Sequence, residues 1–230
     1  MTARASAIRD TRRRFLEVQT MPPTLTTRKP VFARPFFNLT VIKAPLVDLI
    51  AAFAGLPRPV SARRTPFSFP SQAYHASPAD APLLLWSPAC APELTAFMPQ
   101  VGSGDYFVVE YACRRFGFEG VAIRSTTQDV ECPVNEFIVY ESNELRRLVR
   151  AMKDSPRWEF YTKGTPLPFE NEAAYAAKRV RDRLQREALL GYAQAWGAPV
   201  REPEFWSSRQ ESMTLARERS LRTGAGNPDG

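Results

Sequence analysis

Few side chains in this sequence have the chemistry of a catalytic centre, and they are scattered. His75 is the single histidine, so a Cys–His or Ser–His–Asp site would have to use it, and a multi-histidine metal centre is excluded. Cys90 follows an expected strand and precedes Pro92, where a helix N-terminus would lower the pKa of its thiol. Cys90 and His75 are therefore the candidate nucleophile and base. Neither has a partner motif, so an exposed loop histidine and a half-buried structural thiol are the simpler interpretation.

Two carboxylates, Glu159 and Glu170, flank a turn rich in Gly and Pro and could act as acid and base. Strand alternation directs Glu159 away from Trp158 and Phe160, towards solvent. Glu170 is placed to hold the helix that follows it. The run Gly102-Ser103-Gly104 lacks the frames of both a P-loop and a dinucleotide fingerprint. The sequence therefore predicts no catalytic set, no metal site and no cofactor.

The three cysteines, Cys90, Cys113 and Cys132, are too few and too widely spaced for a disulfide framework, and no CxxC pair suggests zinc. A reducing compartment is the simplest location for such thiols. No stretch approaches the roughly 18 consecutive apolar residues of a membrane-spanning helix. We expect a cytoplasmic protein with no membrane partner.

The net charge of +7 is concentrated at the N-terminus. Residues 1–34 hold eight Lys or Arg and two acids, residues 35–200 hold 18 and 17, and residues 201–230 hold five of each. A nucleic-acid-binding fold is expected to have its basic stripe on the folded body. The distribution argues against a nucleic-acid partner and predicts a flexible basic tail over residues 1–34. Nucleic-acid binding by that tail is kept as an alternative.

The hydrophobic patterns predict a single α+β domain over residues 35–200. Strands are expected at 36–42, 83–86, 121–124, 137–140 and 158–161, and helices at 46–53 and 105–116. Residues 145–152 fit helical spacing too, but Ser142-Asn143-Glu144 looks like a hairpin turn, so we favour a strand there. The strands between about 121 and 162 would then form an antiparallel meander on which C-terminal helices pack.

Two regions are expected to lack regular structure. Nine prolines fall between Pro57 and Pro99, which predicts a loop segment over 57–99, apart from the strand at 83–86. A loop of that length is functional or mobile, and whether it forms a site stays open. Residues 201–230 are expected to be a partly disordered extension with a short amphipathic helix around Met213 and Leu215.

The clearest helical periodicity lies after Asn171, a plausible N-cap, and ends before Gly197, and it predicts two helices there. On a continuous helix, at about 100° per residue, Arg179, Arg183 and Arg186 share one face. These three arginines are the candidate partner-binding residues, suited to an acidic protein surface. A solvated helix face with internal ion pairs is the competing interpretation.

Several aromatic, glycine and arginine positions over residues 158–196 form one arrangement: Trp158-Glu159-Phe160, Gly164, Leu167-Pro168-Phe169-Glu170, Tyr175, Arg179-Val180-Arg181-Asp182-Arg183-Leu184, Leu189 and Tyr192. This arrangement resembles the C-terminal part of small bacterial immunity-type proteins, which are associated with polymorphic toxins and secreted effectors. The resemblance implies an α+β domain that neutralises a toxin by binding it, and it carries no catalytic residues. We therefore expect a non-enzymatic protein-binding module. The alternative is a hydrolase-like enzyme with a loop-lined cleft.

Overall fold

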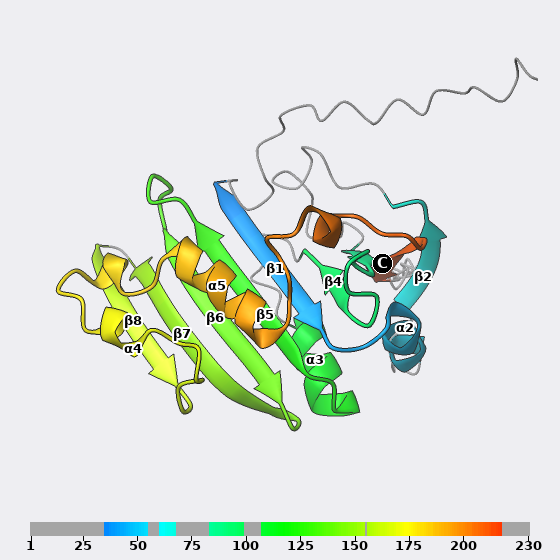
Figure 1. The fold of residues 1–230 in the computed structure, drawn as a ribbon, viewed down its shortest axis with the longest axis horizontal. Coiled ribbons are helices and arrows are strands. Elements are labelled where there is room, and N and C mark those ends of the chain that lie inside the picture. Colours follow the sequence, from blue (N-terminus) through cyan, green and yellow to red (C-terminus); the bar gives the residue numbers. More distant parts are fainter. Residues whose placement is uncertain (1–34, 55–59, 68–82, 99–106, 155, 218–230) are drawn as a thin grey trace, which may run out of the picture. The chain divides into compact units, whose positions relative to one another are not determined.

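One antiparallel sheet of nine strands organises the part of the chain that the structure describes (Figure 1). The computed structural model describes residues 35–54, 60–67, 83–98, 107–154 and 156–217, which lie within one compact unit, Phe32–Gly230. Its elements in chain order are β1 (Phe36–Ile42), α2 (Leu46–Ala54), β2 (Val60–Thr65), β3 (Leu83–Trp86), β4 (Thr95–Phe97), α3 (Phe107–Phe116), β5 (Gly120–Thr126), β6 (Val134–Glu141), β7 (Glu144–Asp154), β8 (Arg157–Lys163), α4 (Glu172–Tyr175), the 3-10 helix η3 (Val180–Asp182), α5 (Arg186–Trp196), the 3-10 helix η4 (Pro203–Trp206) and β9 (Ser212–Arg217). The strand order is β2-β9-β3-β4-β1-β5-β6-β7-β8.

The expected α+β class and the antiparallel meander are confirmed. Strands β5, β6, β7 and β8 pair in chain order, each antiparallel to the next. The turn between β6 and β7 has positive φ at both Ser142 (50°) and Asn143 (66°), the backbone of a type I′ hairpin that matches the right-handed twist of its strands. The segment 145–152 is therefore a strand, as its flanking turn indicated.

Helices α3 and α5 cover opposite faces of the sheet. Ile138 of β6 belongs to a core cluster with Val109 and Ala112 of α3. Its neighbour Phe137 contacts the ring of Tyr192 in α5, with ring centroids 5.5 Å apart. Adjacent residues of a strand point to opposite faces, so the two helices sandwich β5 and β6. Both strands are accordingly almost entirely buried.

The C-terminal segment is an inner strand of the sheet, so the helix expected around Met213 and Leu215 is wrong. Strand β9 lies between β2 and β3 and pairs antiparallel with both. Leu215 is buried at 8% exposure opposite Leu83 and Ala62. The period-two pattern of Met213 and Leu215 fits a strand with one buried face. The pairing partners lie more than a hundred residues away, which is why no local signal identified them.

The Pro-rich segment contains more regular structure than expected. Besides β3, its described parts include β2 and β4, so a loop spanning 57–99 with a single strand is wrong. The prolines border the strands instead of interrupting them: Pro59 precedes β2, Pro66 follows it and Pro82 precedes β3. Proline is tolerated at such positions because no ladder hydrogen bond is lost.

The stretch after Asn171, where two helices are expected, forms α4 and α5 with the 3-10 helix η3 and an extended residue between them. Asn171 caps α4 as predicted, accepting a hydrogen bond from Ala174 N–H at 3.3 Å, and Gly197 ends α5 with a φ of 114°. Between them, Gln185 is extended, with φ −116° and ψ 159°. The chain is held to the sheet here, because the carbonyl of Leu184 accepts a hydrogen bond from Asn135 Nδ2 at 2.9 Å.

The expected flexible tail 1–34 and the end of the C-terminal extension, 218–230, lie outside the described residues, as does His75. None of the described helices is both long and apolar enough to span a membrane.

Candidate binding surface

The three predicted arginines do not share a helix face, because η3 and the extended Gln185 separate them. Arg186 lies at the start of α5, where its Nε donates to Ser125 Oγ at 2.8 Å and its Nη2 to the Ser125 carbonyl at 3.1 Å. Burial lowers the pKa of Arg186. Arg183 donates from Nε to the Ala177 carbonyl at 2.9 Å and lies over the ring of Phe160. Both guanidiniums thus help to hold the chain on the sheet.

Arg179 differs from the other two arginines. It is exposed and precedes η3, and within the described residues no carboxylate lies within ion-pair distance of it. Its segment is fixed at both ends on the same strand residue. Tyr175 contacts Phe160 of β8 at a centroid distance of 5.3 Å, and Arg183 lies 5.5 Å from the same ring. Arg179 is therefore presented from an anchored loop.

Glu170, a candidate for acid–base chemistry, is fully engaged in a buried network. Its carboxylate accepts hydrogen bonds from Arg147 Nε and Nη2, from the Leu167 N–H at 2.9 Å and from the Tyr175 hydroxyl at 2.8 Å. Burial alone would raise the pKa of Glu170, but these hydrogen bonds outweigh it and lower that pKa. Glu170 is thus ionised at neutral pH, and its oxygens are committed to holding the chain after β8. The ion pair between Arg147 of β7 and Glu170 could not be predicted from the sequence.

A second carboxylate, Glu136, lies on the α3 face of the sheet between two arginines. It is 3% exposed, with Arg124 Nη2 3.4 Å and Arg150 Nη1 3.5 Å from its two oxygens. The three residues stand opposite one another on β5, β6 and β7. The row ends on β8, where the guanidinium of Arg150 lies 5.8 Å from the ring centre of Tyr161. Arg150 is 35% exposed and Tyr161 48% exposed, so this row reaches solvent near the edge of the sheet.

The thiols do not have the environment of a nucleophile. Cys90 lies in a turn before β4 and not at a helix N-terminus, so the expected helix is wrong. Burial and then the nearby charge of Glu202 raise the pKa of Cys90, the opposite of what an activated thiolate needs. Burial raises the pKa of Cys113 to about 12. Among the described residues, no three His, Cys, Asp or Glu side chains are close enough together to hold a metal ion.

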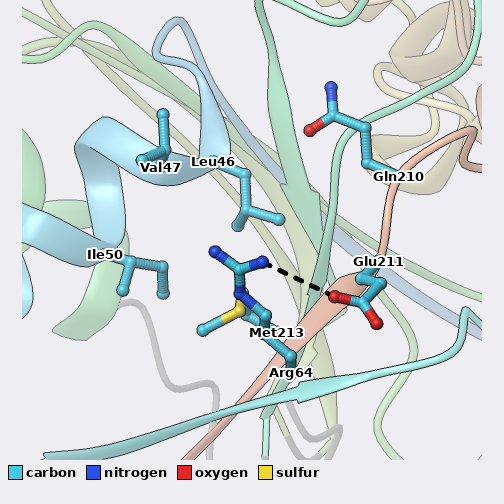
Figure 2. Close-up of a pocket in the computed structure, with 7 residues that line it drawn as sticks. All are labelled: Leu46, Val47, Ile50, Arg64, Gln210, Glu211 and Met213. Carbon is cyan, nitrogen blue, oxygen red and sulfur yellow. Dashed lines mark ion pairs between the residues drawn. The ribbon is translucent and has the colours of Figure 1, made fainter.

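A small pocket lies between α2 and strands β2 and β9 (Figure 2). Leu46, Val47, Ile50 and Met213 provide its apolar lining, and Val47 is 71% exposed. Figure 2 shows the guanidinium of Arg64 directed towards Glu211, with which it forms a 3.7 Å ion pair. The cavity measures about 190 Å³, below the roughly 300–1,000 Å³ of small-molecule sites. Its size fits a single side chain of another protein better than a metabolite.

The surface that combines charge, aromatic area and exposure is the outer edge of the sheet at β8. We call it the β8 surface and define it as β8 with the segment 175–183. Figure 1 shows β8 as the last strand, with α4 beside it. Four of its exposed basic residues have no carboxylate at ion-pair distance among the described residues: Arg157, Lys163, Lys178 and Arg179. Glu159 and Asp182 are its acids, so the surface carries net positive charge.

Comparisons of the chain with protein-family models, with curated proteins and with solved structures find no match.

Proposed function

We propose that this protein is a non-enzymatic, cytoplasmic binding module that neutralises a toxin or effector by holding it in a stable complex, as bacterial immunity proteins do. The observation that carries the proposal is the β8 surface, an exposed edge where four basic side chains have no carboxylate at ion-pair distance among the described residues and lie on the same surface as exposed Tyr161. Its partner is an acidic protein surface. Complementary charge speeds encounter and excludes wrong partners, while aromatic side chains supply contact area.

The way in which the basic residues are held supports binding over solvation alone. Exposed cations elsewhere differ in their surroundings: Lys43 pairs with Glu119 at 2.8 Å and Arg201 with Glu187 at 2.9 Å, whereas Arg63 and Arg115 have no carboxylate at ion-pair distance among the described residues. What distinguishes Arg179 is its position in a segment that Tyr175 and Arg183 anchor on Phe160. Anchoring of this kind lowers the entropy lost when a partner engages the side chain.

The buried Glu170 network supports the same proposal. The carboxylate of Glu170 accepts hydrogen bonds from the Leu167 N–H and the Tyr175 hydroxyl, which fixes the chain between the two parts of the β8 surface. A rigid support is what an interface needs, whereas a proton-transfer centre needs a carboxylate with a pKa near the working pH.

Co-expression of the chain with the product of the adjacent gene, followed by affinity capture, tests the proposal. We expect a stable complex and protection of the host cell from that product. Arg179→Glu should weaken the complex roughly tenfold or more, about 1.4 kcal/mol. Arg115→Glu is the matched control: Arg115 is exposed on α3, and its reversal changes net charge equally. No stable partner and no protection would overturn the proposal, as would equal weakening by the two variants.

A further inference from the structure

Strand β8 leaves half of its backbone hydrogen-bonding groups directed away from the sheet. The Lys153 N–H donates to the Pro133 carbonyl at 2.8 Å. The backbone hydrogen-bonding groups of the odd-numbered residues of β7 therefore point towards β6. Alternation along an antiparallel strand then directs Arg150 and Met152 to β8, where they pair with Tyr161 and Glu159.

The residues between those pairs direct their backbone N–H and carbonyl groups away from the sheet. They are Trp158, Phe160 and Thr162. Within the described residues, no backbone or side-chain group is hydrogen bonded to the N–H or carbonyl of any of the three. An edge of this kind is a template on which an extended segment can add as a further strand.

The side chains of β8 determine which segment fits. Arg157, Glu159, Tyr161 and Lys163 alternate onto one exposed face, the face on which Arg150 lies over Tyr161. The cations Arg157 and Lys163 stand six positions apart in the sequence. An added strand with carboxylates on that face would pair with both, and cross-strand opposite charges are favourable.

A second copy of this chain fits the edge poorly. Antiparallel pairing of two β8 strands about Phe160 would place Arg157 directly opposite Lys163, twice, and like charges in that position are destabilising. The other edge of the sheet, β2, carries Arg63 and Arg64, so pairing of β8 with β2 of another copy also brings like charges together.

We infer that β8 receives an extended, acidic segment of another protein as a tenth strand, with carboxylates directed to Arg157 and Lys163. This inference rests on the proposed function and specifies how the partner is held: backbone hydrogen bonds to Trp158, Phe160 and Thr162 provide the attachment, and charge selects the segment.

The test uses the full chain and a synthetic peptide of alternating threonine and glutamate, with an alternating threonine–lysine peptide as the charge control. Thr162→Pro removes an outward N–H, and Thr162→Val keeps it with a similar β-branched shape. Proline at this edge position breaks no hydrogen bond to β7, so circular dichroism and the unfolding midpoint should match those of Thr162→Val.

We expect the acidic peptide to bind, its affinity to fall at least tenfold in Thr162→Pro relative to Thr162→Val, and the basic peptide not to bind. In the wild-type chain, the saturating acidic peptide should slow amide exchange at Trp158, Phe160 and Thr162 at least tenfold. Amide exchange in the wild-type chain tests strand addition even if the proline variant unfolds.

No binding of the acidic peptide, equal affinity of the two Thr162 variants, or unchanged exchange at the three amides would each overturn strand addition. These failures differ from failure of the proposed function. A partner that is lost on Arg179→Glu but leaves the β8 amides unprotected would be bound through the basic side chains alone.

Discussion

Arg147 donates three hydrogen bonds to Glu170, from Nε to Oε1 at 2.9 Å and to Oε2 at 3.1 Å, and from Nη2 to Oε2 at 2.7 Å. The side chains are 2% and 0% exposed. The pair joins the middle of β7 to the segment that leaves β8. Arg147 also donates from Nη1 to the Gly164 carbonyl at 2.7 Å, so one guanidinium fixes both sides of the turn. The β8 surface depends on this support.

Glu170→Ala should destabilise the fold by about 3–5 kcal/mol, because it leaves the buried guanidinium of Arg147 without its counter-charge. Urea unfolding measures the change. Glu172→Ala is the control, since Glu172 is exposed two residues further along the chain and its loss should change the free energy of unfolding by at most about 0.5 kcal/mol. Similar effects of the two substitutions would show that the pair contributes little.

The same pair should make stability depend on acid pH. Burial acts to raise the pKa of Glu170, but the hydrogen bonds that it accepts lower that pKa below its ordinary value of 4.5. A carboxylate whose pKa is lower in the folded state stabilises the fold fully above its unfolded pKa. That stabilisation is lost as the pH falls from about 4.5 through the lower folded value. Unfolding free energies of wild type and Glu170→Gln, measured from neutral to acid pH, should converge as the pH falls; parallel curves would contradict this.

Gly164 should not tolerate alanine. Its φ is +81°, and a Cβ there would collide with the backbone carbonyl of Arg146. We expect Gly164→Ala to cost at least about 2 kcal/mol in unfolding free energy. Gly191, within α5, provides the opposite case: no atom lies within 4 Å of an added Cβ. Gly191→Ala should stabilise the protein by about 0.5–1 kcal/mol through helix propensity. Thermal unfolding of both variants checks that Gly164→Ala lowers the stability of the protein and Gly191→Ala raises it.

The three free thiols should react in a fixed order. Cys132 is exposed and Cys90 is half-buried with a raised pKa, whereas Cys113 is buried and its pKa is raised to about 12. A thiol reagent at neutral pH should therefore label Cys132 first, Cys90 slowly and Cys113 only after unfolding. Mass spectrometry of timed samples measures the order. Fast labelling of Cys90 would contradict the environment described for it and favour the enzyme alternative.

Local chemistry made part of the fold and of the candidate site predictable. The Ser142-Asn143 turn indicated the β6–β7 hairpin, Asn171 marked the start of a helix and Gly197 marked the end of one. The exposed position of Arg179 also followed from the sequence, as one of three candidate arginines. Each of these features depends on residues within one turn or one strand, where backbone preference is sufficient.

The positions that sequence reasoning missed depend on partners far away in the chain. Arg186 is predicted to lie on a partner-binding face, but its guanidinium donates hydrogen bonds to Ser125. The partner-binding role of the three arginines as a set stays a prediction. Glu170 reads as a helix-capping or catalytic carboxylate until Arg147 is placed beside it. Such pairs are invisible to periodicity, because they join segments whose separation in sequence bears no relation to their distance in space.

By itself, the sequence determined that the chain forms strands in a meander, that glycines follow the helices α3 and α5, and that its cysteines are widely spaced along the chain. Only the tertiary structure decided that β9 enters the sheet between β2 and β3, that the extended Gln185 precedes α5, and that β8 is the outermost strand of the sheet in the described residues. The reason is physical. Turns and caps are local equilibria of the backbone, whereas strand order and open edges depend on which distant apolar faces are buried together.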